Sequence, residues 1–146
     1  MRTILTITLF TLCLMSCSDT SQSNMNKLES DWMAARIAGN PINRMVKPPK
    51  MTININEKKI NGTDGCNSYF GSIVNIDNDK ISFDKLGVTS KLCPNMEIPD
   101  QFQQLLKSTA SYVFEEKILV FRNAQNEEVL AFINISNNNQ SPANEE

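Results

Sequence analysis

The sequence contains no histidine among its 146 residues. Histidine is the usual general base of serine and cysteine hydrolases and the commonest metal-binding side chain in proteins. Its absence therefore excludes Ser-His-Asp and Cys-His catalysis, together with metal centres that depend on histidine. We predict no catalytic residue, no metal site and no cofactor.

An excess of charge of one sign is also lacking. Lys and Arg total 14 against 16 Asp and Glu, and the two signs are interspersed along the chain. A surface that binds nucleic acid needs a concentrated basic patch, so nucleic acid is not an expected partner. The length suits one domain of ordinary size rather than two, and we expect that domain to be a monomer.

No apolar run is long enough to span a bilayer. The run from Ile4 to Met15 follows the basic Arg2 and has the length of a signal-peptide core. It ends at Ser16-Cys17, a small residue directly before cysteine, which resembles the lipobox of bacterial lipoproteins. We predict that residues 1–16 are a lipoprotein signal peptide and that Cys17 is lipidated, an ordinary cleaved signal being the alternative. The protein would then lie in the cell envelope, anchored to the outer membrane on its periplasmic or surface face.

Cysteine is scarce, and processing would reduce it further. Cys13 would leave with the signal peptide and Cys17 would carry lipid, which leaves Cys66 and Cys93. An even pair in an oxidising compartment predicts a disulfide, which the chain-entropy model values at about 3.5 kcal/mol. Two free buried thiols are the alternative; two cysteines without histidine make a poor zinc site.

The two ends of the mature chain lack the apolar residues that a core requires. Residues 17–27 are small and polar, as in a flexible tether, and residues 137–146 have the composition of a disordered tail. The folded domain is therefore predicted over residues 28–136.

Within that domain the main signal is alternation. Met51, Ile53 and Ile55 are separated by polar residues, which predicts a strand with one buried face. Similar patterns between turn residues predict further antiparallel strands over Lys58–Asp64, Ser68–Ile76 (broken at Gly71), Lys80–Phe83, Tyr112–Phe114, Ile118–Phe121 and Val129–Ile135.

One helix is predicted from Ile98 to Ser108. Phe102, Leu105 and Leu106 fall at helical spacing, whereas Gln103 and Lys107 are expected on the outward face. A helix and a sheet that are each apolar on one side can bury those sides only against each other. We therefore expect the Phe102 face to pack on the concave side of the sheet.

The segment Gly65-Cys66-Asn67-Ser68-Tyr69-Phe70-Gly71 is the most specific in the domain. Together with Trp32, the Met51–Ile55 strand, Thr89 and Cys93, it resembles the META domain family, the HslJ-like lipoproteins, over about Leu28 to Ile135. The sequence departs from that pattern at Ser90-Lys91-Leu92, where a Met-rich stretch is commoner. The resemblance implies an α+β, mostly β fold, a strongly curved antiparallel sheet or half-open barrel wrapped against one central helix. It implies no reaction, since the family's members are treated as envelope, stress-associated or secretion-accessory proteins.

Four residues of the pattern are candidates for a site. We favour a structural role for Gly65, which permits special backbone conformations, and for Asn67, whose side chain can bond nearby backbone. The alternative is that Asn67, Thr89 and the backbone at Gly65 line a ligand pocket. Trp32 is expected in the core or as a lid, with stacking on a ligand as its alternative role.

These observations favour a non-enzymatic protein, anchored to the membrane by lipid, whose META-like domain supports or binds a protein partner in envelope or stress physiology. A module that binds a small apolar ligand or a lipid is the first alternative. A cysteine-based enzyme ranks last, because it would require a free Cys66 and has no histidine base.

Overall fold

A computed structural model describes residues 25–43 and 46–136. They form one antiparallel sheet, a short helical turn at residues 25–28 and a helix of twelve residues, α2. The sheet order is β6-β5-β4-β3-β1-β9-β8-β7, with the short β2 paired to β1. The bounds are β1 Asp31–Ile37, β2 Asn40–Pro41, β3 Lys50–Asn54, β4 Lys59–Thr63, β5 Ser68–Ile76, β6 Ile81–Val88, α2 Glu97–Ser108, β7 Ser111–Glu115, β8 Ile118–Arg122 and β9 Glu128–Asn134.

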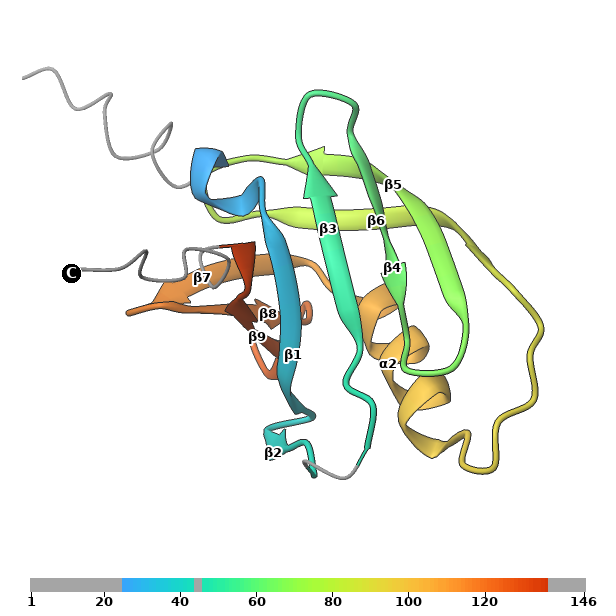
Figure 1. Ribbon diagram of the computed structural model, residues 1–146. Helices are drawn as coiled ribbons and strands as arrows, with labels where there is room; N and C mark the ends of the chain where they lie inside the picture. The colour runs from blue at the N-terminus through green and yellow to red at the C-terminus, as the bar shows by residue number, and fades with distance from the viewer. Residues whose placement is uncertain (1–24, 44–45, 137–146) are drawn as a thin grey trace, which may run out of the picture.

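The sheet curls until its two end strands meet at one point (Figure 1). Lys80 and Ser111 form an isolated antiparallel bridge, and the Tyr112 N–H donates to the Asp79 carbonyl at 2.7 Å. Beyond that contact β6 and β7 do not pair with each other, and α2 packs against β6 and β9. The result is the strongly curled half-barrel around one helix that the sequence predicts.

The helix buries the side that its periodicity indicates. Phe102 and Leu106 are fully buried, and the Phe102 ring lies 5.6 Å from that of Tyr69 on β5 and 6.3 Å from that of Phe132 on β9, centroid to centroid. Leu105 is only half-buried. The helix therefore closes the half-barrel by filling its concave side with aromatic and aliphatic side chains.

Aromatic contacts continue the core beyond the helix. Phe121 lies 5.2 Å from Phe132 and 5.6 Å from Phe83, between ring centroids, so rings from β6, β8 and β9 meet inside the curl. Phe121 and Phe132 have no exposed surface. These rings occupy the interior position in which a half-open barrel could hold a ligand.

Four expectations need correction. Residues 31–37 form β1, which lies between β3 and β9, although no strand was predicted there. β6 continues to Val88 rather than ending at Phe83. Gly71 does not end β5, although the register of β5 against β6 shifts there, between Phe70 and Ser72. A Cβ at Gly71 would lie 2.4 Å from Leu86 Cδ2, so glycine allows Leu86 to pack on the strand. Gln103 does not face solvent: its side chain is directed towards a turn after β4, described below.

The two ends of the described domain are joined by hydrogen bonds. Ser30 Oγ lies 2.8 Å from Ser136 Oγ, and the Asp31 N–H donates to Ser136 Oγ at 2.9 Å. The Ile135 N–H donates to the Asp31 carbonyl at 2.9 Å. Residues near both ends therefore lie together at one end of the half-barrel, away from the start of α2 (Figure 1). Within the described residues, no helix has the length and apolar character needed to cross a bilayer.

Candidate functional site

The turn after β4 is built around a buried carboxylate. Asp64 is 1% exposed, and its Oδ1 accepts the N–H groups of Cys66 at 2.9 Å and Asn67 at 2.6 Å. The Asp64 N–H in turn donates to the Asn67 carbonyl at 3.0 Å. This Asp64–Asn67 turn satisfies its own backbone with a side chain, as aspartate does in Asx turns.

Gly65 is required at the second position of the turn. Its φ is +104°, a conformation that side-chain-bearing residues rarely adopt, and a Cβ would lie 2.7 Å from the Lys47 carbonyl oxygen. The predicted structural role of Gly65 therefore has two physical causes, the backbone angle and the close approach of the chain before β3.

Asn67 connects this turn to the 89–96 loop that precedes α2. Its side chain is 5% exposed, and Oδ1 accepts hydrogen bonds from Thr89 Oγ1 at 3.2 Å and from the Lys91 N–H at 2.7 Å. Thr89 Oγ1 also accepts the Ser68 N–H at 3.1 Å. Asn67 directly precedes β5 and Thr89 directly follows β6, so the antiparallel pairing of these two strands brings the two residues together.

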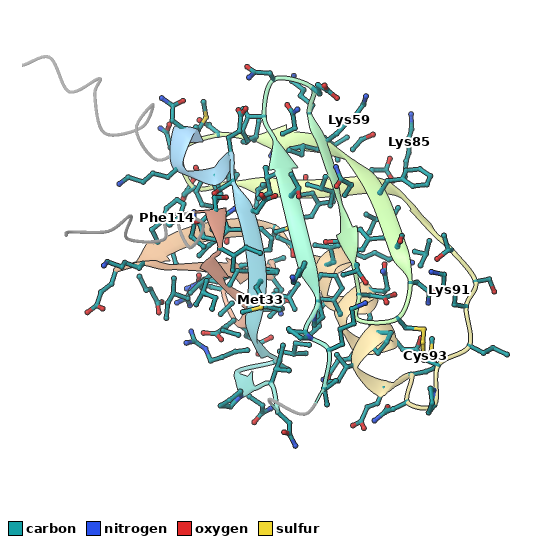
Figure 2. The ribbon with its side chains drawn as sticks, in the orientation of Figure 1. Met33, Lys59, Lys85, Lys91, Cys93 and Phe114 are labelled. Carbon is teal, nitrogen blue, oxygen red and sulfur yellow. A yellow bond between two sulfur atoms is a disulfide. The ribbon has the colours of Figure 1, made fainter. Side chains whose placement is uncertain are left out.

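A disulfide joins the same two segments. Cys66 and Cys93 are bonded with an S–S distance of 2.10 Å and a Cα–Cα distance of 6.0 Å (Figure 2). The bond attaches the Asp64–Asn67 turn to the loop at a second point, two residues after the Lys91 N–H that Asn67 holds. The first half of the 89–96 loop is consequently fixed by one covalent bond and several hydrogen bonds.

The loop carries one fully exposed apolar side chain between these attachments. Leu92 is 95% exposed, the largest fraction among the large apolar residues that the structure describes. Its preceding residue is held by Asn67 and its following residue by Cys66. The backbone on both sides of Leu92 is therefore fixed while its side chain contacts solvent.

Two residues that were not among the site candidates complete this region: Gln103, and Tyr69 of the motif itself. Gln103 on α2 donates from Nε2 to Asp64 Oδ2 at 3.2 Å, so the carboxylate joins the turn to the helix. The Tyr69 hydroxyl donates to the Lys50 carbonyl at 3.1 Å. Burial raises the pKa of the Tyr69 phenol, and the nearby Asp64 carboxylate raises it further. The Asp-Gly dipeptide was the available sequence signal for the turn.

Trp32 lies elsewhere, near the joined ends of the domain. It is 2% exposed, its Nε1–H donates to the Leu28 carbonyl at 2.9 Å, and its ring centroid is 6.1 Å from that of Phe114. A cleft of about 740 Å³ opens beside these two rings. This Trp32 cleft is lined by Asn26, Lys27, Glu29, Ser30, Trp32, Phe114, Glu116, Lys117, Ile118, Ile133 and Asn134.

A second, apolar groove lies on the outer face of β1 and β9. Its volume is about 480 Å³, and this Met33 groove is lined by Met33, Ala34, Ala35, Ile42, Asn43, Val46, Pro48 and Ile133. Ile133 borders both the groove and the Trp32 cleft. The candidate residues therefore divide into two regions: Gly65, Asn67 and Thr89 meet at the disulfide, whereas Trp32 lines a cleft at the joined ends.

The comparisons with known proteins concern the family and the overall fold. A model of the META domain matches residues 23–135, which is most of the chain. The chain belongs to the META domain family. That result confirms the resemblance to the META domain family. It does not distinguish the HslJ-like lipoproteins within the family.

Two solved structures share the META domain's fold. An NMR structure of a protein from Burkholderia xenovorans is 19% identical, with a TM-score of 0.59 over 89% of this chain and 99% of that one. Another NMR structure is 18% identical, with a TM-score of 0.56 over 73% of this chain and 89% of the other. At such identities the likeness concerns the fold alone. No curated protein sequence matches this chain.

The chemistry available to this META domain follows from the geometry. The Asp64 carboxylate accepts hydrogen bonds from the two turn N–H groups and from Gln103. Its oxygens therefore stabilise the turn and its contact with the helix. Within residues 25–43 and 46–136, no three His, Cys, Asp or Glu side chains cluster as metal ligands would. The META domain family is not a known enzyme family. Cys17 and the predicted signal peptide lie outside the described residues.

Proposed function

We propose that this META domain protein is a lipid-anchored envelope protein of the HslJ-like kind, which acts by binding a protein partner. Its signal peptide would end at Ser16, Cys17 would carry the lipid, and the domain would stand at the outer membrane on its periplasmic or surface face. The motif around Gly65-Cys66-Asn67 and the lipobox-like residues before Cys17 support this assignment.

The joined ends of the domain give this proposal an orientation. Ser30 and Ser136 are hydrogen-bonded to each other, so the segment that leads back to Cys17 starts at that end. Cys93 lies on the other side of the domain from Phe114, which is near the joined ends (Figure 2). An anchor at Cys17 would therefore leave the disulfide and the 89–96 loop directed away from the anchored end.

The observation that carries the proposal is the fixed exposure of Leu92. A single exposed leucine is ordinary on a soluble protein and needs no explanation by itself. Leu92 differs because Lys91 is held by Asn67 and Cys93 by the disulfide, so little backbone freedom is left to lose on binding. A preorganised side chain loses less conformational entropy when it inserts into a partner's pocket, and an aliphatic side chain can serve as such an anchor.

A catalytic role has less support. The cysteine-based alternative needs a free thiol at Cys66, and that sulfur is bonded to Cys93. A binding site inside the half-barrel also has less support, because Phe102, Phe121 and Phe132 fill the interior and are fully buried. Binding on the outer surface is the function that the geometry favours.

Site-specific photocrosslinking in intact cells tests the proposal. A photoreactive amino acid at position 92 should yield one defined protein adduct. The same group at position 74 should not, although Val74 is also aliphatic and 63% exposed. The captured protein is then purified and its affinity measured for Leu92→Asp and Val74→Asp. We expect about tenfold weaker binding for the first and no change for the second. Adducts of equal yield at both positions, or none at 92, would refute partner binding through this loop.

A further inference from the structure

The Trp32 cleft and the Met33 groove adjoin but differ in character. Every lining residue of the groove except Asn43 is apolar. The cleft combines the Trp32 and Phe114 rings with a rim that carries two lysines and two glutamates. The two sites adjoin at Ile133, which lines both and is 36% exposed on β9. Together they form one surface that is apolar along one part and charged along the other.

The outward direction of the apolar side chains follows from the sheet register. Met33 pairs with Ile133, and Ile133 pairs with Ile118, so these three side chains lie on the same face of the sheet. The neighbouring Trp32 and Phe132 point to the opposite, buried face. The Met33–Ile133–Ile118 strip is therefore on the outside of the half-barrel, where the core does not cover it.

The charges of the rim are available to a ligand. Lys27 and Lys117 are exposed, and among the described residues neither forms an ion pair. Glu116 is likewise exposed and unpaired in the part of the chain that the structure describes, while Glu29 contacts only the Asn56 amide, at 3.4 Å. A rim with both signs complements a headgroup that carries both an anion and a cation.

We propose that these two adjoining sites bind a single phospholipid with a zwitterionic headgroup, one acyl chain lying in the Met33 groove. The phosphate would lie near Lys27 and Lys117, and the ammonium near Glu29 and Glu116. Apolar side chains that contact an acyl chain gain free energy with each methylene removed from water. The surface is thus a ligand site distinct from the 89–96 loop.

The location of the cleft fits a lipid ligand. Asn26 and Lys27 line it, and the predicted lipidation site Cys17 precedes Asn26 by nine residues. Nine residues reach at most about 30 Å when extended. A bilayer holding the anchor would therefore lie within that distance of the cleft. The inference uses the proposed anchor only as a source of lipid, and it is tested without it.

The chain's single tryptophan provides the measurement. Trp32 lines the cleft, and bromine quenches indole fluorescence only at short range. The mature chain carrying Cys17→Ser is titrated with a monomeric dihexanoyl phosphatidylethanolamine that is brominated on one acyl chain. We expect saturable quenching, whereas the corresponding phosphatidylglycerol should bind several-fold more weakly because its headgroup carries no cation.

Matched variants place the binding on this surface. Ile133→Glu should weaken binding by about tenfold or more, because a carboxylate would lose water against the acyl chain. Val74→Glu, an equivalent change at another exposed aliphatic residue of the same sheet, should leave it unchanged. Lys117→Glu should weaken binding of the phosphate headgroup. Ile133→Ala, a mild change at a partly exposed site, serves as a second variant should Ile133→Glu fail to fold.

Several outcomes would overturn the inference. Absence of saturable quenching, or equal loss in the Ile133 and Val74 variants, would exclude a defined site. A preference for phosphatidylglycerol would refute the headgroup assignment. A photoreactive residue at position 133 that captures a polypeptide rather than lipid in cells would make this face a protein interface. None of these results depends on Leu92, so they leave the proposed partner binding separately testable.

Discussion

Arg36 on β1 and Glu128 on β9 form a two-bond ion pair. Arg36 Nε donates to Glu128 Oε1 at 2.7 Å, and Nη2 donates to Oε2 at 2.9 Å. The side chains are 27% and 22% exposed, and they lie on the outer face beside Ala131, which is fully buried. The pair thus joins the first strand of the described domain to the last, and two parallel hydrogen bonds are the strongest arrangement for arginine and carboxylate.

Because of this ion pair, we predict that the free energy of unfolding of the domain decreases at acidic pH. The hydrogen bonds from Arg36 lower the pKa of Glu128 below its ordinary value of 4.5, although burial opposes them. A carboxylate whose folded pKa is lowered stabilises the fold at pH above its unfolded pKa. The contribution, about 1 kcal/mol for a partly exposed bidentate pair, should disappear as the pH falls from 4.5 towards the folded pKa.

Chemical denaturation as a function of pH checks this prediction. Glu128→Gln should lower the free energy of unfolding at pH 7 and have little effect at the acid end of the range. Glu57→Gln is the control, because its ion pair with Lys59 is largely exposed, at 58% and 65% of the two side chains. A Glu128→Gln protein with the same pH profile as the wild type would show that the pair contributes no measurable stability.

The disulfide yields a second prediction. Reduction of Cys66–Cys93, or replacement of both residues by alanine, should lower the free energy of unfolding by about 2–5 kcal/mol. The physical cause is the lost constraint on the unfolded chain, together with the freed 89–96 loop. Urea unfolding with and without reductant measures the loss. Two alkylatable thiols in protein purified oxidised from the envelope would contradict the bond itself.

The hydrogen bond between Asp64 and Gln103 provides a third prediction. The sequence pattern alone places Gln103 wrongly. Helical periodicity places Gln103 on the outward face with Lys107, but Gln103 bonds to Asp64 from a position 39 residues later in the chain. Asp64→Ala should cost about 2–3 kcal/mol, because two buried N–H groups lose a charged acceptor. Gln103→Ala should cost about 1 kcal/mol. Gln104→Ala, at the exposed neighbour, should change stability by less than about 0.5 kcal/mol, so equal effects at 103 and 104 would exclude the contact.

The sequence analysis did not predict β1 or the two-residue β2. For β1 the reason is a bulge. Trp32 and Ala34 point inward, but the register of β1 against β9 shifts between Ala34 and Arg36, so the next inward residue is Ile37. The alternation of period two is therefore interrupted in the middle of a short strand. β6 was cut short at Phe83 for the same reason, since its register also shifts and Lys85 has a φ of +52°.

Features with a strong local signal were predictable. β5 has the bounds that the sequence indicates, and α2 starts one residue before the predicted Ile98. The candidate site could be predicted only in part from the sequence. Gly65, Asn67 and Thr89 were found through one motif, but the role of Gln103 and the separation of Trp32 from the other three depend on which strands become neighbours. Long-range pairing such as β1 with β9 leaves no pattern in either strand by itself.

The packing of α2 gives a fourth prediction. Phe102→Ala should cost about 3–5 kcal/mol, because the ring is fully buried between Tyr69 and Phe132 and would leave a cavity. Lys107→Ala, at an exposed position of the same helix, should change stability by less than about 0.5 kcal/mol. Thermal unfolding of both variants compares the two faces, and similar melting temperatures would be incompatible with the helix orientation described above.

Lipidation is the last prediction, and the orientation proposed for the partner-binding loop depends on where it places the domain. Cys17→Ser removes the thiol that would accept the lipid, so the variant should leave the membrane fraction or accumulate as uncleaved precursor. Cys13→Ser makes the same chemical change inside the apolar run, where no lipid is expected, and should fractionate as the wild type does. Membrane fractionation with mass determination of the mature chain distinguishes the cases, because lipid adds mass only when Cys17 is present. If Cys17→Ser remained in the membrane at the wild-type mass, the anchor would be wrong. The orientation inferred for Leu92 would then lose its basis, whereas phospholipid binding near Trp32 would still be decided by the quenching of Trp32.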